Sequence, residues 1–218
     1  MEKKNVLHVI SVSFSINYFF GNQFNYLSSI NGSRYFLVCS PSEELIELSG
    51  KLNYTPLAVC ITRTISPFRD FLAILKIFRL IKINKIDVVV GHTPKGGMVA
   101  MLAAYLAGVK YRVYFRHGII YETSRGVKKF ILKNIDRLSG NIATKVVCVS
   151  HSVKEISDKD NLNNPKKNVI LGLGTCSGID TEEKYNPMLQ KQEVINKLCR
   201  ELNFKEHDFV IGFVGRIV

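Results

Sequence analysis

Two short segments place histidine, cationic side chains and glycine directly after runs of apolar residues. The first is HTPKGG, which follows the apolar run IDVVVG and contains His92, Thr93, Lys95, Gly96 and Gly97. The glycines let backbone N–H groups approach a ligand, a helix that begins here contributes its positive end, and Lys95 adds a full charge. We therefore predict a site for a phosphate or a polyhydroxylated ligand, with a plain helix entrance and a solvated lysine as the alternative.

The second segment, RHGIIYETSRG, follows the apolar run YRVYF. Arg116 and His117 come directly after the run, and Gly118 allows a tight turn. Arginine binds phosphates or carboxylates, and an imidazole donates a hydrogen bond or exchanges a proton near neutral pH. We predict that Arg116 and His117 belong to the site, whereas His151, after the run KVVCVS, is structural or lines a cleft.

Apolar runs rich in valine and isoleucine alternate with helical patterns along most of the chain. This alternation predicts a Rossmann-like α/β fold, in which helices cover both faces of a parallel sheet. Ligands bind such sheets at the carboxyl ends of the strands, where His92 and His117 would lie. The predicted strands cover residues 6–12, 34–40, 56–61, 86–91, 111–115, 145–150 and 167–171, and the predicted helices cover residues 19–30, 41–50, 66–84, 94–108, 127–143 and 151–159.

The predicted helix over residues 66–84 carries two distinct faces. Ser66 suits its N-cap and Pro67 its first turn. The cationic residues lie close together on one face: Arg69, Lys76 and Arg79. The spacing of the large apolar residues predicts one broad apolar face: Phe71, Leu72, Leu75, Phe78 and Ile83.

The composition is that of a globular protein with a strongly basic balance. Of the 218 residues, 46% are hydrophobic and 22% are charged, which excludes a disordered chain. The net charge of +12 predicts attraction to a polyanion, such as nucleic acid, an anionic membrane surface or a phosphate-bearing small molecule. We exclude nucleic acid because the sequence has no recognised binding motif and its basic residues are spread through helices.

The cysteines and the N-terminus predict a cytoplasmic protein. Five cysteines are scattered without a C-x-x-C pair, which favours free thiols over a disulfide framework or a zinc site. The first residues, MEKKNVLHVISV, lack the apolar core of a signal peptide. The longest weakly charged stretch, GGMVAMLAAYLAGV, is too short to cross a bilayer.

Motifs of several cofactor-dependent and hydrolytic enzymes are absent from the sequence. The segment LGLGTCSGID spaces its glycines as G-x-G-x-x-x-G, which differs from the dinucleotide-binding fingerprint. The Walker pattern, G-x-S-x-G and H-E-x-x-H do not occur. We therefore expect neither a cofactor nor a bound metal.

Several segments together resemble the retaining GT-B glycosyltransferases of family four, in particular enzymes of capsular polysaccharide and O-antigen biosynthesis. They are VLHVISV, KIDVVVGHTPKGGMVAMLAAYLAGV, YRVYFRHG, ATKVVCVSHSVKE, GTCSGIDTEEKYNP and VIGFVGRIV, in the order in which the family has them. The resemblance implies two Rossmann-like domains that face a cleft: an N-terminal one that binds the acceptor and a C-terminal one that binds most of a nucleotide-sugar. Residues 1–185 would form the first domain, and residues 186–218 a linker helix and the first strand of a truncated second domain.

The resemblance also implies roles for individual residues. His117 matches a cleft histidine near the transferred sugar, and residues 92–97, which with Arg116 form our predicted acceptor site, match an acceptor-side loop. Gly215 and Arg216 match a turn whose arginine, with a lysine a few residues later, holds the donor diphosphate. The sequence lacks that lysine and the later glutamate-rich motif, and its first loop has a single Gly21 where many members carry a glycine pair.

The implied activity is of the hexosyltransferase type: transfer of a sugar from a nucleotide-sugar to a glycan or lipid-linked acceptor in cell-surface polysaccharide biosynthesis. Cationic side chains, rather than a metal, would offset the charge on the leaving diphosphate. Because the sequence stops at the first strand expected for the donor domain, we expect a truncated chain with little or no activity alone. The basic residues of the helix over 66–84 and of residues 125–133 predict peripheral contact with the inner membrane face.

Two other interpretations stay open on the sequence. One is a non-catalytic acceptor-binding module that works with a separately encoded donor-domain partner. The other is a sugar-nucleotide epimerase of related fold, whose acidic and histidine site residues cannot be placed in this sequence.

Overall fold

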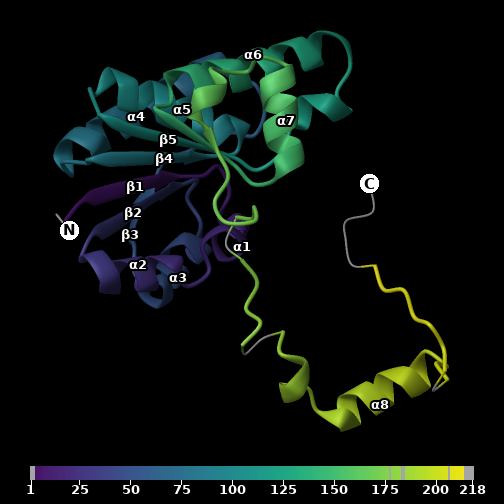
Figure 1. The fold of residues 1–218 in the computed structure, drawn as a ribbon. Coiled ribbons are helices and arrows are strands. Elements are labelled where there is room, and N and C mark those ends of the chain that lie inside the picture. Colours follow the sequence, from purple (N-terminus) through teal and green to yellow (C-terminus); the bar gives the residue numbers. More distant parts are fainter. Residues whose placement is uncertain (1–2, 177, 183–184, 206, 214–218) are drawn as a thin grey trace. The chain divides into compact units, whose positions relative to one another are not determined.

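Seven parallel strands form the centre of a computed structural model of the protein, which describes residues 3–176, 178–182, 185–205 and 207–213 (Figure 1). The strands are β1 (Asn5–Val9), β2 (Arg34–Cys39), β3 (Thr55–Ala58), β4 (Val88–His92), β5 (Tyr111–Arg116), β6 (Lys145–Cys148) and β7 (Asn168–Val169). Their order in the sheet is β3-β2-β1-β4-β5-β6-β7, and every neighbouring pair is parallel. The predicted Rossmann-like sheet is therefore confirmed.

The direction of winding reverses between β1 and β4. From β1 the chain first builds outward through β2 and β3, and then returns to build β4 to β7 on the other side of β1. At such a switch point the connections leave in opposite directions, which opens a crevice at the carboxyl ends of the two strands. The predicted site residue His92 is the last residue of β4 and therefore lies at this crevice.

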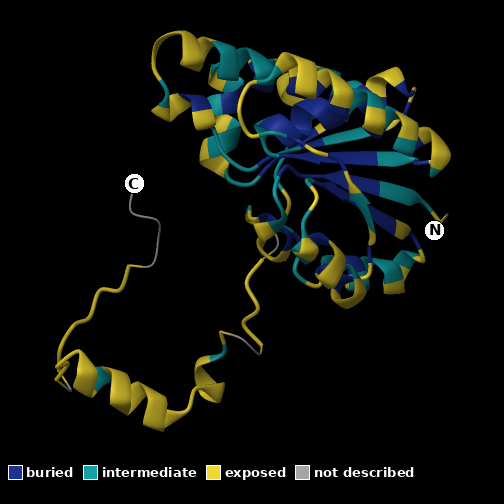
Figure 2. Cartoon of the chain, turned by 180° about the vertical axis from the view of Figure 1, so that it is seen from behind, coloured by how far each residue is buried: buried dark blue, intermediate teal, exposed yellow. Residues whose placement is uncertain are grey.

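Helices cover both faces of the sheet, as predicted. One face packs against α1 (Ile16–Phe20), α2 (Gln23–Asn31) and α3 (Glu43–Leu52), and the other against α4 (Pro67–Ile83), α5 (Pro94–Leu106), α6 (Gly126–Ile142) and α7 (His151–Lys159). Short 3-10 helices are η1 (Ser13–Ser15), η2 (Ile120–Thr123), η3 (Pro165–Lys167) and η4 (Pro187–Leu189). Figure 2 shows the strands and α5 mainly buried, with exposed residues on the outer sides of the helices.

Several boundaries differ from the sequence-based predictions for local reasons. The helix predicted over residues 19–30 is divided into α1 and α2 because Gly21 adopts a positive φ of 45°. Helix α3 does not stop at Gly50 but continues to Leu52, and Asn53 takes the left-handed conformation that ends it. The predicted strands over 6–12 and 56–61 end at Val9 and Ala58, where pairing with the neighbouring strand stops.

The apolar face predicted for α4 is only partly the buried one. The helix buries Ala73, Ile77 and Ile81, which pack in the same core as the alanines of α5, whereas Phe71 is 56% and Leu72 42% exposed. The small and β-branched residues of α4 pack against the alanine-rich α5, Phe78 packs at the margin of this core, and Phe71 and Leu72 remain outside. Periodicity indicates that a face is apolar but does not say which of two apolar stripes is buried.

The chain divides into two compact units, Met1–Ser177 and Gly178–Val218. The described part of the second unit contains η4 and α8 (Gln192–Glu201), and most of its residues are exposed. Residues 209–213, where we predicted a strand up to Val214, form no strand, and Val214 lies outside the described residues. The division into domains at residues 1–185 and 186–218 stays a prediction.

Within the described residues, no helix combines the length and the apolar character that a membrane span needs. Helix α5, the most apolar one, is buried against the sheet, α4 and α6.

Candidate functional site

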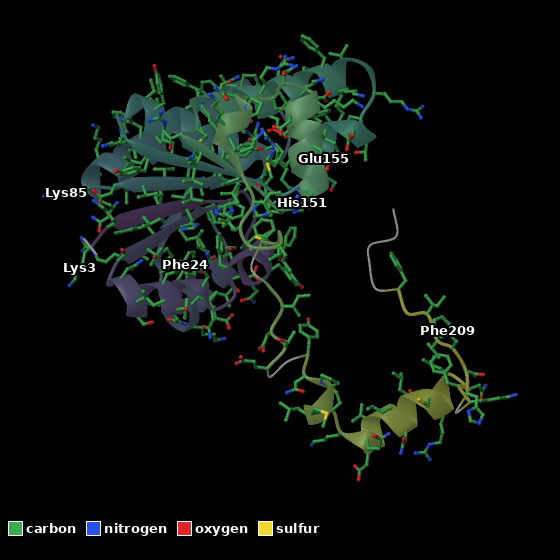
Figure 3. The ribbon with its side chains drawn as sticks, viewed as in Figure 1. Lys3, Phe24, Lys85, His151, Glu155 and Phe209 are labelled. Atoms are coloured by element: carbon green, nitrogen blue, oxygen red, sulfur yellow. The ribbon has the colours of Figure 1, made fainter. Side chains whose placement is uncertain are left out.

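Three histidines form a continuous hydrogen-bonded chain at the switch point. His8 Nδ1 lies 3.0 Å from His92 Nε2, and His92 Nδ1 lies 3.0 Å from His117 Nε2. His8 and His92 are only 6% and 2% exposed, whereas His117 is half-buried. The chain therefore leads from the core to the carboxyl-end edge of the sheet, the edge that His151 marks in Figure 3, opposite Lys3 and Lys85.

Strand register explains why the three side chains meet. His8 in β1 pairs with Val90 in β4, and His92 is two residues further along β4. His92 in turn pairs with Phe115 in β5, and His117 is two residues beyond Phe115. Because side chains two residues apart point to the same face of a strand, all three imidazoles lie on one face of the sheet.

Phenylalanine rings surround this chain on the side of α1 and α2. The ring of Phe19 stacks on His117, with a centroid distance of 4.1 Å and an interplanar angle of 6°. Phe20 and Phe24 meet His8 edge-on at 5.2 and 4.9 Å, and Phe24 is labelled in Figure 3. These contacts fix the planes of the imidazoles and exclude water from all but the outer end of the chain.

Burial lowers the pKa of each of the three imidazoles. The pKa of His8 falls to about 3 and that of His117 to about 4, both because burial disfavours the charged form. The pKa of His92 lies well below its usual range, because of burial and of the two neighbouring histidines. The chain is therefore uncharged at neutral pH, and each ring has one donor and one acceptor nitrogen.

Lys95 is not free to bind a ligand, contrary to our prediction. Its Nζ lies 2.5 Å from Asp70 Oδ2, and both side chains are buried between α5 and α4. The backbone N–H of Ser66 also donates to Asp70, whereas the Ser66 hydroxyl makes no capping bond. The charge of Lys95 is thus compensated within the protein, and the pair joins the first turns of the two helices.

The glycines of the HTPKGG segment serve helix–sheet packing rather than ligand approach. A Cβ atom on Gly97 would lie 2.3 Å from the ring of Tyr114, and one on Gly96 would lie 3.1 Å from the carbonyl oxygen of Val9. Gly91, at the end of the preceding run, faces Gly97 at a similarly short distance. The three glycines allow α5 to lie directly on β1, β4 and β5.

Thr93 connects His92 to α5 in an unusual conformation. Its φ of 64° and ψ of 161° are strained for a β-branched residue, at a cost of about 1–3 kcal/mol. Its hydroxyl oxygen is buried and has no hydrogen-bond partner among the described residues. Backbone strain of this kind is frequent at functional sites. Of the residues predicted in HTPKGG, His92 and Thr93 therefore remain candidates for the site.

Arg116 points away from the site, contrary to our prediction. It is 0% exposed and donates hydrogen bonds to Asp136 Oδ1, Ser157 Oγ and Asn163 Oδ1 at 3.0, 2.5 and 3.1 Å. Because it precedes His117 by one residue, its side chain lies on the opposite face of the sheet. Its guanidinium joins β5 to α6 and α7 and has a structural role.

The remaining predictions concern donor contacts, metals and cofactors. Gly215 and Arg216 lie outside the described residues. Among the described residues, no group of three or more histidine, cysteine, aspartate or glutamate side chains is arranged to hold a metal ion. The expectation that the protein needs neither a metal nor a cofactor stays a prediction.

His8 is the site residue that the sequence analysis missed. It stands alone inside the apolar run VLHVIS, and a single histidine in a strand carries no motif. The signal that could have found it is the alternation of side chains along a strand. His8 pairs with Val90, two residues before His92, so both histidines point to the same face of the sheet.

Comparison with known proteins gives a consistent family. A sequence model described as Glycosyltransferase Family 4 matches residues 31–171. The whole chain is 29% identical to the capsular polysaccharide biosynthesis glycosyltransferase CapM of Staphylococcus aureus and covers 54% of that protein. Over 185 residues, 83% of the chain, it is 29% identical to the UDP-Gal:alpha-D-GlcNAc-diphosphoundecaprenol alpha-1,3-galactosyltransferase of Escherichia coli and covers 45% of it.

Solved structures show the same fold. A glycosyltransferase from Rickettsia africae has a TM-score of 0.67 at 20% identity, with 95% of this chain and 51% of that one covered. Anabaena Alr3699/HepE in complex with UDP-glucose has a TM-score of 0.64 at 12% identity, covering 92% of this chain and 50% of that one. The chain thus spans about half the length of the relatives and structures that it matches.

Proposed function

Because the chain belongs to Glycosyltransferase Family 4, we propose that the whole protein transfers a sugar from a nucleotide-sugar to a glycan or lipid-linked acceptor in cell-surface polysaccharide biosynthesis. The names of the two relatives support this proposal, since one acts in capsule biosynthesis and the other uses UDP-galactose and a diphosphoundecaprenol-linked sugar. The proposal concerns the whole protein because the chain spans about half of these relatives.

The observation that carries the proposal is the presentation of His117 at the switch point. Its Nε2 is occupied by His92, so Nδ1 is the nitrogen left for a ligand, and Phe19 holds the ring plane. A neutral imidazole in a fixed plane suits a sugar hydroxyl, which can both donate and accept a hydrogen bond. His117 would orient the transferred sugar, Thr93 would line the acceptor side, and His92 would hold His117 in place through their hydrogen bond.

The donor would be a nucleoside diphosphate sugar. HepE, a structural neighbour, has been solved with UDP-glucose and with UDP, and the E. coli relative is named for UDP-galactose. The leaving diphosphate acquires negative charge in the transition state and needs cationic side chains. We assign this role to Arg216, next to Gly215, with no metal or cofactor required.

The acceptor would be reached at a membrane surface. Helices α4 and α6 run antiparallel to the strands, so their N-terminal turns lie at the same edge of the sheet as His117. Exposed apolar and cationic side chains occupy the first turns of α4 (Phe68, Arg69, Phe71 and Leu72) and the start of α6 (Arg125, Val127, Lys128, Lys129 and Phe130). Lys76 and Arg79 are also exposed but lie further along α4. Such a combination binds anionic lipid, at about 1 kcal/mol per cationic residue, and suits a cytoplasmic enzyme acting on a lipid-linked acceptor.

Sugar transfer tests the proposal. The chain, extended beyond residue 218 by the second half of the S. aureus relative, is assayed with a panel of UDP-sugars and lipid-diphosphate-linked acceptors. We expect transfer, and a loss of about 100-fold in turnover for His117→Ala, because the sugar is no longer oriented. His207→Ala, an exposed histidine of the second unit, is the matched control. Full turnover in His117→Ala contradicts the assignment, and acceptor binding without transfer favours the non-catalytic binding module.

A further inference from the structure

The hydrogen bonds between the three histidines restrict where their protons are. A neutral imidazole carries one N–H, and each hydrogen bond needs the proton on one nitrogen only. If His8 carries its proton on Nδ1, His92 accepts at Nε2 and must carry its own proton on Nδ1. His117 then accepts at Nε2 and is also protonated at Nδ1. In the opposite direction all three rings carry the proton on Nε2.

We propose that His8, His92 and His117 form a single tautomeric unit, in which His8 and His92 are positioning residues that set whether Nδ1 of His117 offers a proton or a lone pair to the ligand. Mixed tautomers would leave one of the two 3.0 Å contacts with two protons or with none. The inference rests on the proposed function only for the nature of the ligand, because the coupling itself is a property of the hydrogen bonds.

The side chains around the three histidines prevent water from replacing any of the hydrogen bonds between them. His92 is 2% exposed and uses both ring nitrogens within the chain, so a water molecule cannot replace a lost partner. The edge-on rings of Phe20 and Phe24 hold His8, and Phe19 holds His117. The low pKa values at both ends keep an extra proton out of the chain, since an imidazolium has no acceptor nitrogen.

The coupling has a consequence for ligand recognition. A sugar hydroxyl fits either state, whereas a phosphate oxygen accepts only and selects the state in which all three rings are protonated at Nδ1. A ligand at the edge of the sheet therefore sets the tautomer of His8, which is linked to His117 only through His92. The same site therefore accommodates hydroxyl and phosphate groups by reversing the direction of the hydrogen bonds between the three histidines.

Nitrogen NMR on the 218-residue chain tests the inference. Long-range 1H–15N spectra at neutral pH report which nitrogen of each histidine is protonated. We expect one shared tautomer for the three rings and a change at His117 in His8→Phe, which keeps an aromatic ring but removes the hydrogen bond. Phe24→Leu is the control, because it alters the packing on His8 but leaves all three imidazoles in place.

The outcomes separate coupling from packing and from function. Different tautomers within the wild-type chain overturn the proposal, as does a His117 signature that stays the same in His8→Phe or that Phe24→Leu changes equally. Should His8→Phe fail to fold, His8→Asn replaces it, because its short side chain can still donate or accept a hydrogen bond. The wild-type spectrum tests the proposal without any variant, since it shows whether the three rings share one tautomer. Inorganic phosphate, used as a probe, should shift all three rings to the Nδ1–H form. If the extended chain transfers no sugar, the proposed function fails, but the expected spectra of the three histidines stay the same.

Discussion

Mild acid should unfold the protein because the histidine chain is buried uncharged. The folded-state pKa values of about 3 for His8 and about 4 for His117 lie below the ordinary value of 6.5. A depressed histidine pKa stabilises the fold fully above the unfolded value, and this stabilisation is lost as the pH falls from about 6.5 towards the folded value. At about pH 5, each of the two histidines has lost about 2 kcal/mol, or about 4 kcal/mol together.

His92 acts in the same direction, so the total loss is a large part of a typical stability of about 5–15 kcal/mol. Urea unfolding followed by circular dichroism at about pH 7.5, 6 and 5 measures the effect. The slope near pH 5 corresponds to about three protons taken up on unfolding, or about 4 kcal/mol per pH unit. His8→Phe should remove one proton from this slope. A stability that is constant over this range would refute the reasoning.

Three further predictions concern packing and surface. Arg116→Ala should lower stability by about 3–5 kcal/mol, seen as a fall of roughly 6–20 °C in Tm, because it leaves a buried carboxylate unpaired; an unchanged Tm would contradict a structural role. Gly97→Ala should destabilise by at least about 1 kcal/mol, because its Cβ would lie 2.3 Å from a tyrosine ring. Gly50→Ala, with open space around it, should stabilise α3 by about 0.5–1 kcal/mol in the same denaturation assay. Equal effects of the two glycine variants on stability would argue against the close approach of Gly97 to the tyrosine ring. Phe130→Ser should weaken salt-sensitive binding to anionic vesicles in a flotation assay, whereas Lys85→Ala, at the other edge of the sheet, should change it less; equal losses would count against a surface at the N-terminal turns.

Local patterns were sufficient to predict most of the first unit. Valine-rich runs bounded by turn residues predicted the strands, and the parallel order followed from their alternation with helices. Side-chain direction was harder to predict, as α4 illustrates. Its buried stripe, with Ile77, depends on how small the residues of α5 are, and that is a property of two elements together.

The candidate site was predicted in position more accurately than in detail. His92 and His117 do meet at the carboxyl ends of their strands, as expected for a parallel sheet. Lys95 and Arg116 were assigned to the ligand because each carries a full charge shortly after a predicted strand, but their acidic partners lie 25 and 20 residues away along the chain. Sequence spacing alone does not reveal such partners, since they meet only through tertiary packing.

The neighbouring positions 116 and 117 divide two tasks at the end of β5. One side chain anchors the strand end from behind to α6 and α7, and the next projects into the crevice. Under the proposed function, variants meant to change which sugar is accepted would therefore alter residues 118–124, which follow Arg116, and would keep the hydrogen bonds of Arg116 unchanged. Changes behind the sheet would move the imidazole through its backbone, so they would impair every substrate alike.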